Sequence, residues 1–129
     1  MREYDDFRDL DVWQRCCSIR KRIWELCYKF PAVEKFRLTD QLIRASRSAA
    51  ACIAEGYGRY HFQENIQFCR QSRGSLYELI DHLLVAVECS YVDQETGNKE
   101  VNEIKTTIRM INGYIKYLKK QKEKGTTAK

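Results

Sequence analysis

The chain contains a single proline, Pro31, and its six glycines lie mostly near the ends of periodic apolar segments. Proline breaks helices and glycine weakens them, so their placement leaves long stretches free to be helical. Within these stretches apolar residues recur at alternating spacings of three and four. No segment shows the two-residue alternation of a half-buried strand. This pattern predicts an all-α protein.

Four helices are expected, at about residues 10–29, 39–56, 62–91 and 98–122. Asp9 and Thr39 are the expected N-caps of the first two, and residues 93–98 are expected to form a turn. Gly74 inside the third helix is expected to allow close packing of another helix. Alternating three-four spacings favour shallow crossing angles, as in bundles with short connections. We therefore predict an antiparallel up-down four-helix bundle, one domain over residues 1–122, with a basic flexible tail over 123–129.

The composition excludes several classes of protein. The chain has 129 residues, of which 43% are hydrophobic and 32% charged, a mixture typical of one globular domain. No run approaches the roughly 20 apolar residues that span a bilayer. The acidic, polar beginning of the chain differs from a signal peptide, so we expect a cytoplasmic protein with no membrane partner.

The net charge of +5 is concentrated at the end of the chain. Residues 1–115 carry equal numbers of basic and acidic side chains, whereas six lysines and one glutamate follow from Lys116 onward. A basic terminal segment is able to bind nucleic acid, and Lys116, Lys119 and Lys120 are candidates for that role. The alternative is a tail that only increases solubility.

Catalytic and metal-binding patterns are absent from the sequence. The two histidines, His61 and His82, lie at the start of the third predicted helix and on it, 21 residues apart, which separates them by about 30 Å. The six cysteines show no C-x-x-C spacing, and we expect most of them to be buried as free thiols. Neither a phosphate loop nor a paired E-x-x-H set is present. We expect no enzymatic activity, no cofactor, no metal and no small-molecule substrate.

A second apolar stripe runs along the first helix, outside its core seam. Leu10, Cys17 and Trp24 repeat every seven residues, with Trp13 beside them. These four residues are candidates for an interface between subunits, and the alternative is that the tryptophans are boundary residues of the core. A row of cations with the same repeat is expected to form ion pairs beside a seam or a charged rim for a partner: Arg8, Arg15, Arg22 and Lys29.

Five arginines surround the predicted hairpin between the second and third helices. They form two pairs spaced three apart and one turn residue: Arg44 with Arg47, Arg70 with Arg73, and Arg59. Grouped on one surface, they would bind phosphates. The alternative is that they pair with Glu55, Glu64 and Glu78 to hold the hairpin together.

Several blocks of sequence resemble the four-helix-bundle family named for proteins encoded in intervening sequences of 23S ribosomal RNA genes. The blocks are FRDLDVWQ (7–14), Phe30-Pro31 with Glu34, LTDQLIRA (38–45), SAAACIAEGYGR (48–59) and GSLYEL (74–79). That family is similar to the accessory variability determinant of diversity-generating retroelements. The chain departs from the usual pattern at Cys52, where asparagine is common, and at Ala49, where a branched aliphatic residue is common.

The resemblance implies a homo-oligomer, commonly a pentameric barrel, with no known catalytic activity. In the retroelement relatives it also implies binding to nucleic acid and to a reverse transcriptase. Our hypothesis is a non-catalytic homo-oligomeric scaffold that binds RNA or DNA, as the accessory subunit of such an enzyme. The alternative is a protein-interaction or structural oligomer with no nucleic-acid role.

Overall fold

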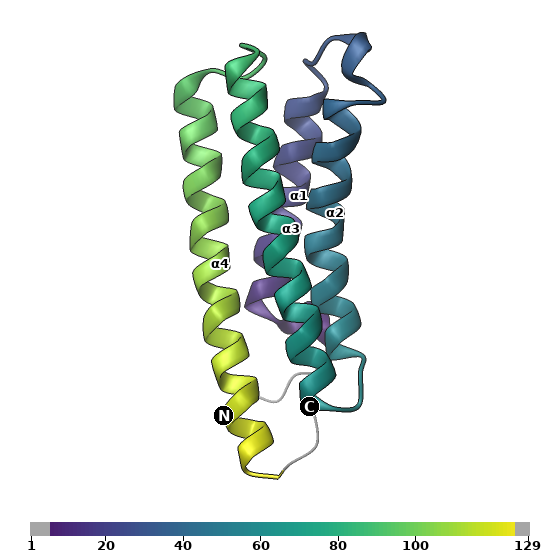
Figure 1. Cartoon of the computed structure of the whole chain (residues 1–129), viewed down its shortest axis with the longest axis vertical. Coiled ribbons are helices and arrows are strands. Elements are labelled where there is room, and N and C mark those ends of the chain that lie inside the picture. Colours follow the sequence, from purple (N-terminus) through teal and green to yellow (C-terminus); the bar gives the residue numbers. More distant parts are fainter. Residues whose placement is uncertain (1–5, 126–129) are drawn as a thin grey trace.

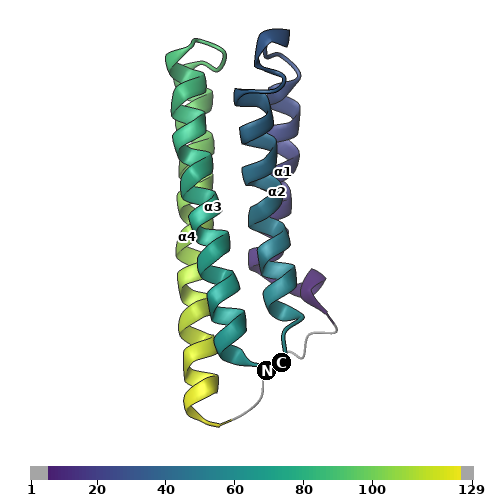
Figure 2. The same cartoon turned by 45° about the vertical axis from the view of Figure 1, so that its right-hand side comes forward.

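The computed structural model describes residues 6–125, which form four long antiparallel helices (Figure 1). These are α1 (Asp11–Cys27), α2 (Leu38–Tyr57), α3 (Phe62–Glu88) and α4 (Gln94–Glu123). Two short 3-10 turns, η1 (Phe7–Asp9) and η2 (Ala32–Glu34), precede α1 and α2. Both α1 and α3 pack side by side with α2 and with α4, and α1 and α3 lie diagonally across the bundle from each other (Figure 2). The predicted antiparallel four-helix architecture is confirmed.

The core lies where the three-four spacings place it. One seam from each helix faces the centre; on α3 it includes Leu79 and Ala86, with Ile80 and Val87 half-buried beside it. The largest fully buried apolar side chains are Ile19, Ile23, Leu42, Ile53, Ile66, Leu76, Leu79, Leu83, Ile104 and Ile111. Because each helix buries one face only, its other face is left for ion pairs and external contacts.

Small residues bring α2 and α3 close together. Ser72 donates a hydrogen bond to the Ala49 carbonyl at 2.7 Å, and Ser75 donates to the Ser48 hydroxyl at 3.0 Å. Near the turn, Gly56 meets Asn65 so closely that an added Cβ would lie 2.7 Å from the Asn65 Oδ1. Gly56, in the sequence block 48–59, is therefore required by helix packing.

The predicted turn at residues 93–98 is wrong, because α4 already begins at Gln94. The Asp93 side chain caps the helix by accepting a hydrogen bond from the Thr96 amide at 2.7 Å. Gly97 is buried inside the first turns, where an added Cβ would lie 2.5 Å from Val87 Cγ2. Gly97 thus serves helix packing and does not form a turn.

Three local expectations are also corrected. Asp9 does not cap α1, whose N-cap is Leu10, and Thr39 lies inside α2, whose N-cap is Arg37. The Glu34 carboxylate accepts a hydrogen bond from the Leu38 amide at 3.3 Å, next to the start of α2. Gly74 is exposed, and an added Cβ would meet nothing within 4 Å, so no helix within residues 6–125 explains that glycine.

Of the predicted basic tail, residues 126–129 lie outside the described residues, and Glu123 still belongs to α4. None of the helices within residues 6–125 combines the length and the apolar character that crossing a bilayer requires.

Candidate nucleic-acid interface

The five arginines of the predicted hairpin do not form one surface. Arg47 of α2 points toward α1, with its guanidinium 5.7 Å from the centre of the Trp24 ring. Arg73 of α3 points toward α4 and donates a hydrogen bond to the Asn112 side chain at 2.7 Å. The two arginine pairs therefore lie beside different neighbours, and a single five-arginine phosphate grip is excluded.

Arg59, in the turn between α2 and α3, is held by its own hairpin. It forms ion pairs with Glu55 at 2.9 Å and Glu64 at 3.7 Å, and its guanidinium lies 4.9 Å from the centre of the Phe68 ring. The alternative, in which the hairpin arginines pair with glutamates, is thus confirmed for Arg59. Glu78, the third expected acid, instead lies 3.3 Å from the His82 ring.

Arg70 belongs to a different group, the cation cluster, which we define as Arg70, Lys119 and Lys122. These three side chains line a cleft of about 350 Å³ between the start of α3 and the end of α4. Gln63 and Ile66 complete its α3 side, and Gln63 accepts a hydrogen bond from Lys122 Nζ at 2.6 Å. Antiparallel packing brings these cations together from positions about 50 residues apart in the chain.

The cation cluster retains most of its charge for an external anion. Glu123 lines the same cleft, but among residues 6–125 no carboxylate forms an ion pair with Arg70, Lys119 or Lys122. Lys116 and Lys120 are exposed on the same last turns of α4. In contrast, Arg44 lies 4.0 Å from Asp40. Of the three lysine candidates, Lys119 therefore lies beside Arg70, and a role for Lys116 and Lys120 stays a prediction.

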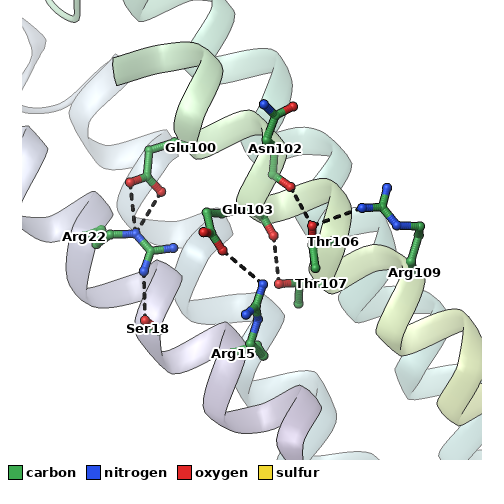
Figure 3. Close-up of polar contacts among 9 residues, drawn as sticks. All are labelled: Arg15, Ser18, Arg22, Glu100, Asn102, Glu103, Thr106, Thr107 and Arg109. Atoms are coloured by element: carbon green, nitrogen blue, oxygen red, sulfur yellow. Dashed lines mark hydrogen bonds and ion pairs between the residues drawn. The ribbon is translucent and has the colours of Figure 1, made fainter. Parts of the chain in front are cut away.

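Two of the heptad-spaced arginines join α1 to α4 (Figure 3). Arg15 reaches the Glu103 carboxylate at 3.0 Å, and Arg22 Nε donates to both oxygens of Glu100 at 2.9 and 3.0 Å. Ser18 accepts a further hydrogen bond from Arg22 at 2.8 Å. For Arg15 and Arg22 the ion-pair alternative is confirmed, so neither offers a free charge to phosphate.

The apolar stripe on α1 is only partly external. Leu10 is buried, and Trp13 packs edge-to-face on Phe7 at 5.2 Å between ring centres. Cys17 is half-buried, whereas 45% of Trp24 is exposed. Leu10 and Trp13 are therefore part of the chain's own packing, and an interface role for Cys17 and Trp24 stays a prediction.

The sequence interpretation missed an aromatic groove between α1 and α2, which we define as Trp24, Tyr28, Phe36 and Ile43. These residues line a cleft of about 320 Å³ together with Cys27, Lys35, Thr39 and Asp40. Phe36 is 84% exposed and Tyr28 is 74% exposed, which is unusual for aromatic side chains grouped on one surface. Because Phe30-Pro31 ends the first helical segment, the sequence could have indicated that Phe36 lies outside the helical seams.

The thiols show no sign of activation for chemistry. Burial raises the pKa of Cys16 and of Cys69 to about 12, and that of Cys27 to about 11. A thiol with a raised pKa is a poor nucleophile near neutral pH. Within residues 6–125, no three His, Cys, Asp or Glu side chains are grouped as metal ligands.

The comparison with protein families agrees with the fold and with the sequence blocks. Residues 8–113 match the model of the family described as 23S rRNA-intervening sequence protein. The chain belongs to this family. The match includes Arg70 and Arg73 but stops before Lys116, so the lysine part of the cation cluster lies beyond the matched family region.

A solved structure of the same kind supports the fold. The chain is similar to a protein with unknown function from the S23 ribosomal protein family of Bacteroides thetaiotaomicron, with a TM-score of 0.75 at 19% identity. The similarity covers 81% of this chain and 98% of that protein. No curated protein matches the chain. This chain thus shares the fold of that protein.

Proposed function

We propose that the protein is a non-catalytic homo-oligomeric scaffold that binds nucleic acid through the cation cluster. The observation that carries this proposal is the cleft in which Arg70, Lys119 and Lys122 converge without an ion-paired carboxylate among residues 6–125. Converging cations bind a phosphate backbone by releasing its condensed counterions. Lys116 and Lys120, exposed nearby on α4, extend the contact along a strand.

The position of the cation cluster supports this role. Arg70 is half-buried and fixed on the rigid body of α3, so it loses less freedom on binding than a terminal lysine does. Its planar guanidinium suits two phosphate oxygens at once, whereas the lysines supply point charges. The family description refers to the 23S rRNA intervening sequence, which makes RNA the first ligand to test.

The binding test measures the affinity of fluorescently labelled single-stranded RNA and DNA of 20 nucleotides for three proteins: the unchanged protein and two variants. R70A/K119A/K122A should bind at least tenfold more weakly than the unchanged protein. K99A/K105A/R109A removes the same number of charges from exposed positions elsewhere on α4 and should bind almost as well. Equal losses in the two variants would show that only the overall charge matters.

A second candidate function is protein interaction without a nucleic-acid role, and the aromatic groove favours it. Exposed aromatic side chains around a cleft are typical of surfaces that bind another protein.

The pentamer implied by the resemblance is the expected assembly for both candidate functions, whereas the reverse transcriptase is the expected partner of the nucleic-acid-binding scaffold. Light scattering at micromolar protein measures the assembly directly: a monomer contradicts the homo-oligomeric scaffold.

A further inference from the structure

A second exposed surface with apolar residues lies on the outer face of α3. The α3 stripe, which we define as Gly74, Tyr77, Asp81, Leu84 and Glu88, follows spacings of 3, 4, 3 and 4 along the outer face of α3. Tyr77 is 57% exposed and Leu84 is 54% exposed. A three-four seam on an exposed face lacks a partner helix within the chain.

The two surfaces carry opposite charge. Around the aromatic groove, Arg20, Lys21 and Arg47 line a cleft that adjoins Trp24, and Lys35 lies over the Phe36 ring. The one acid of the groove, Asp40, lies beside Arg44. On the α3 stripe, Asp81 and Glu88 are exposed and form no ion pair with any residue of 6–125.

The fold places the surfaces at the same level. Both α1 and α3 run toward the end of the bundle at the top of Figure 1, where α1 ends at Cys27 and α3 ends at Glu88. Trp24 lies in the last turn of α1, and Leu84 and Glu88 lie in the last two turns of α3. Because α1 and α3 occupy diagonal corners, their outer faces point in different directions.

We propose that the aromatic groove of one copy binds the α3 stripe of the next copy, with the copies side by side and parallel. Rotation about an axis parallel to the bundle keeps every residue at its own level, so the two surfaces of neighbouring copies meet. Such a contact joins two different surfaces, and repeated contacts of this kind close into a ring. Basic side chains beside Trp24 then face the free carboxylates of Asp81 and Glu88, and Tyr77 and Leu84 cover the exposed aromatic rings.

This inference rests on the homo-oligomeric part of the proposed function and specifies its contact surfaces. Charge-reversal variants of the full chain test it by light scattering at tens of micromolar protein. K21E/R47E makes the groove acidic, D81K/E88K makes the stripe basic, and each variant should be monomeric. The combined variant K21E/R47E/D81K/E88K restores opposite charges and should recover the oligomer. K99E/K105E, with two charge reversals at exposed positions of α4, should remain oligomeric.

The outcomes separate the two ideas. An unchanged protein that is monomeric contradicts both the inference and the homo-oligomeric scaffold. An oligomer that survives D81K/E88K overturns the groove-to-stripe contact and leaves the scaffold standing. Dissociation of both paired variants without recovery in the combined variant overturns the charge complementarity. Circular dichroism confirms in each case that the helices are intact.

Discussion

Arg22 of α1 and Glu100 of α4 form a bifurcated hydrogen bond, in which the Arg22 Nε lies 2.9 and 3.0 Å from the two carboxylate oxygens. Only 8% of the Glu100 side chain and 34% of the Arg22 side chain are exposed. A carboxylate buried to this degree needs its partner, since a lone buried charge is strongly destabilising. The pair therefore links α1 to α4 in a partly buried position, beside the apolar core that both helices share.

Replacing Arg22 by alanine should lower the free energy of unfolding by about 2–3 kcal/mol, because Glu100 is left buried without a partner. Arg15→Ala is the matched control, since 37% of Arg15 and 42% of Glu103 are exposed, and it should cost about 1 kcal/mol or less. Urea unfolding at equal protein concentration measures both values. Similar losses in the two variants would refute the special role of the buried pair.

Gly56→Ala should destabilise the protein by about 1–3 kcal/mol, because the new Cβ would lie 2.8 Å from the Phe68 Cβ. Gly113 is the matched control: it lies inside α4, and its added Cβ would meet nothing within 4 Å. Gly113→Ala should stabilise the protein by up to about 1 kcal/mol through helix propensity. Thermal unfolding compares the two, and a stabilising Gly56→Ala would contradict the described helix packing.

Stability should fall as the pH rises from 9 toward 12. In this window an unfolded chain loses the protons of Cys16 and Cys69, whose ordinary pKa is 9.0, while burial keeps these thiols protonated in the folded protein. Each thiol contributes a decrease of about 1.4 kcal/mol per pH unit to the free energy of unfolding. C16A/C69A should remove about twice that slope, because both thiols are buried. Unchanged slopes in C16A/C69A would show that the two thiols are not protected.

The helical architecture could be predicted from the sequence because one apolar seam per helix is a local pattern. The Asp93 cap is also a local bond, to the Thr96 amide. The start of α4 could not be predicted from Gly97, which is typical of a turn until its contact with Val87 of α3 is known. The expectation for Gly74 failed for a similar reason. A glycine inside a helix indicates close approach or open surface equally well until its neighbours are known.

The candidate site was only partly predictable. The residue types were recognised, but spacing within one helix does not show which neighbour a side chain faces. Arg70 and Lys119 come together only because α3 and α4 pack antiparallel, while Arg47 turns toward Trp24. The aromatic groove requires the geometry of a loop, and Phe36 follows no helical repeat.

The central claim, that the cation cluster binds a nucleic-acid backbone, is tested most directly by the salt dependence of RNA binding. The logarithm of the association constant for a single strand should fall linearly with the logarithm of salt concentration, and each lost phosphate contact should reduce the slope by about 0.7. R70A/K119A/K122A should therefore show a slope about 2 units shallower than the unchanged protein, and K99A/K105A/R109A should keep the original slope. Identical slopes for the unchanged protein and R70A/K119A/K122A, or no binding of RNA at low salt, would contradict the claim.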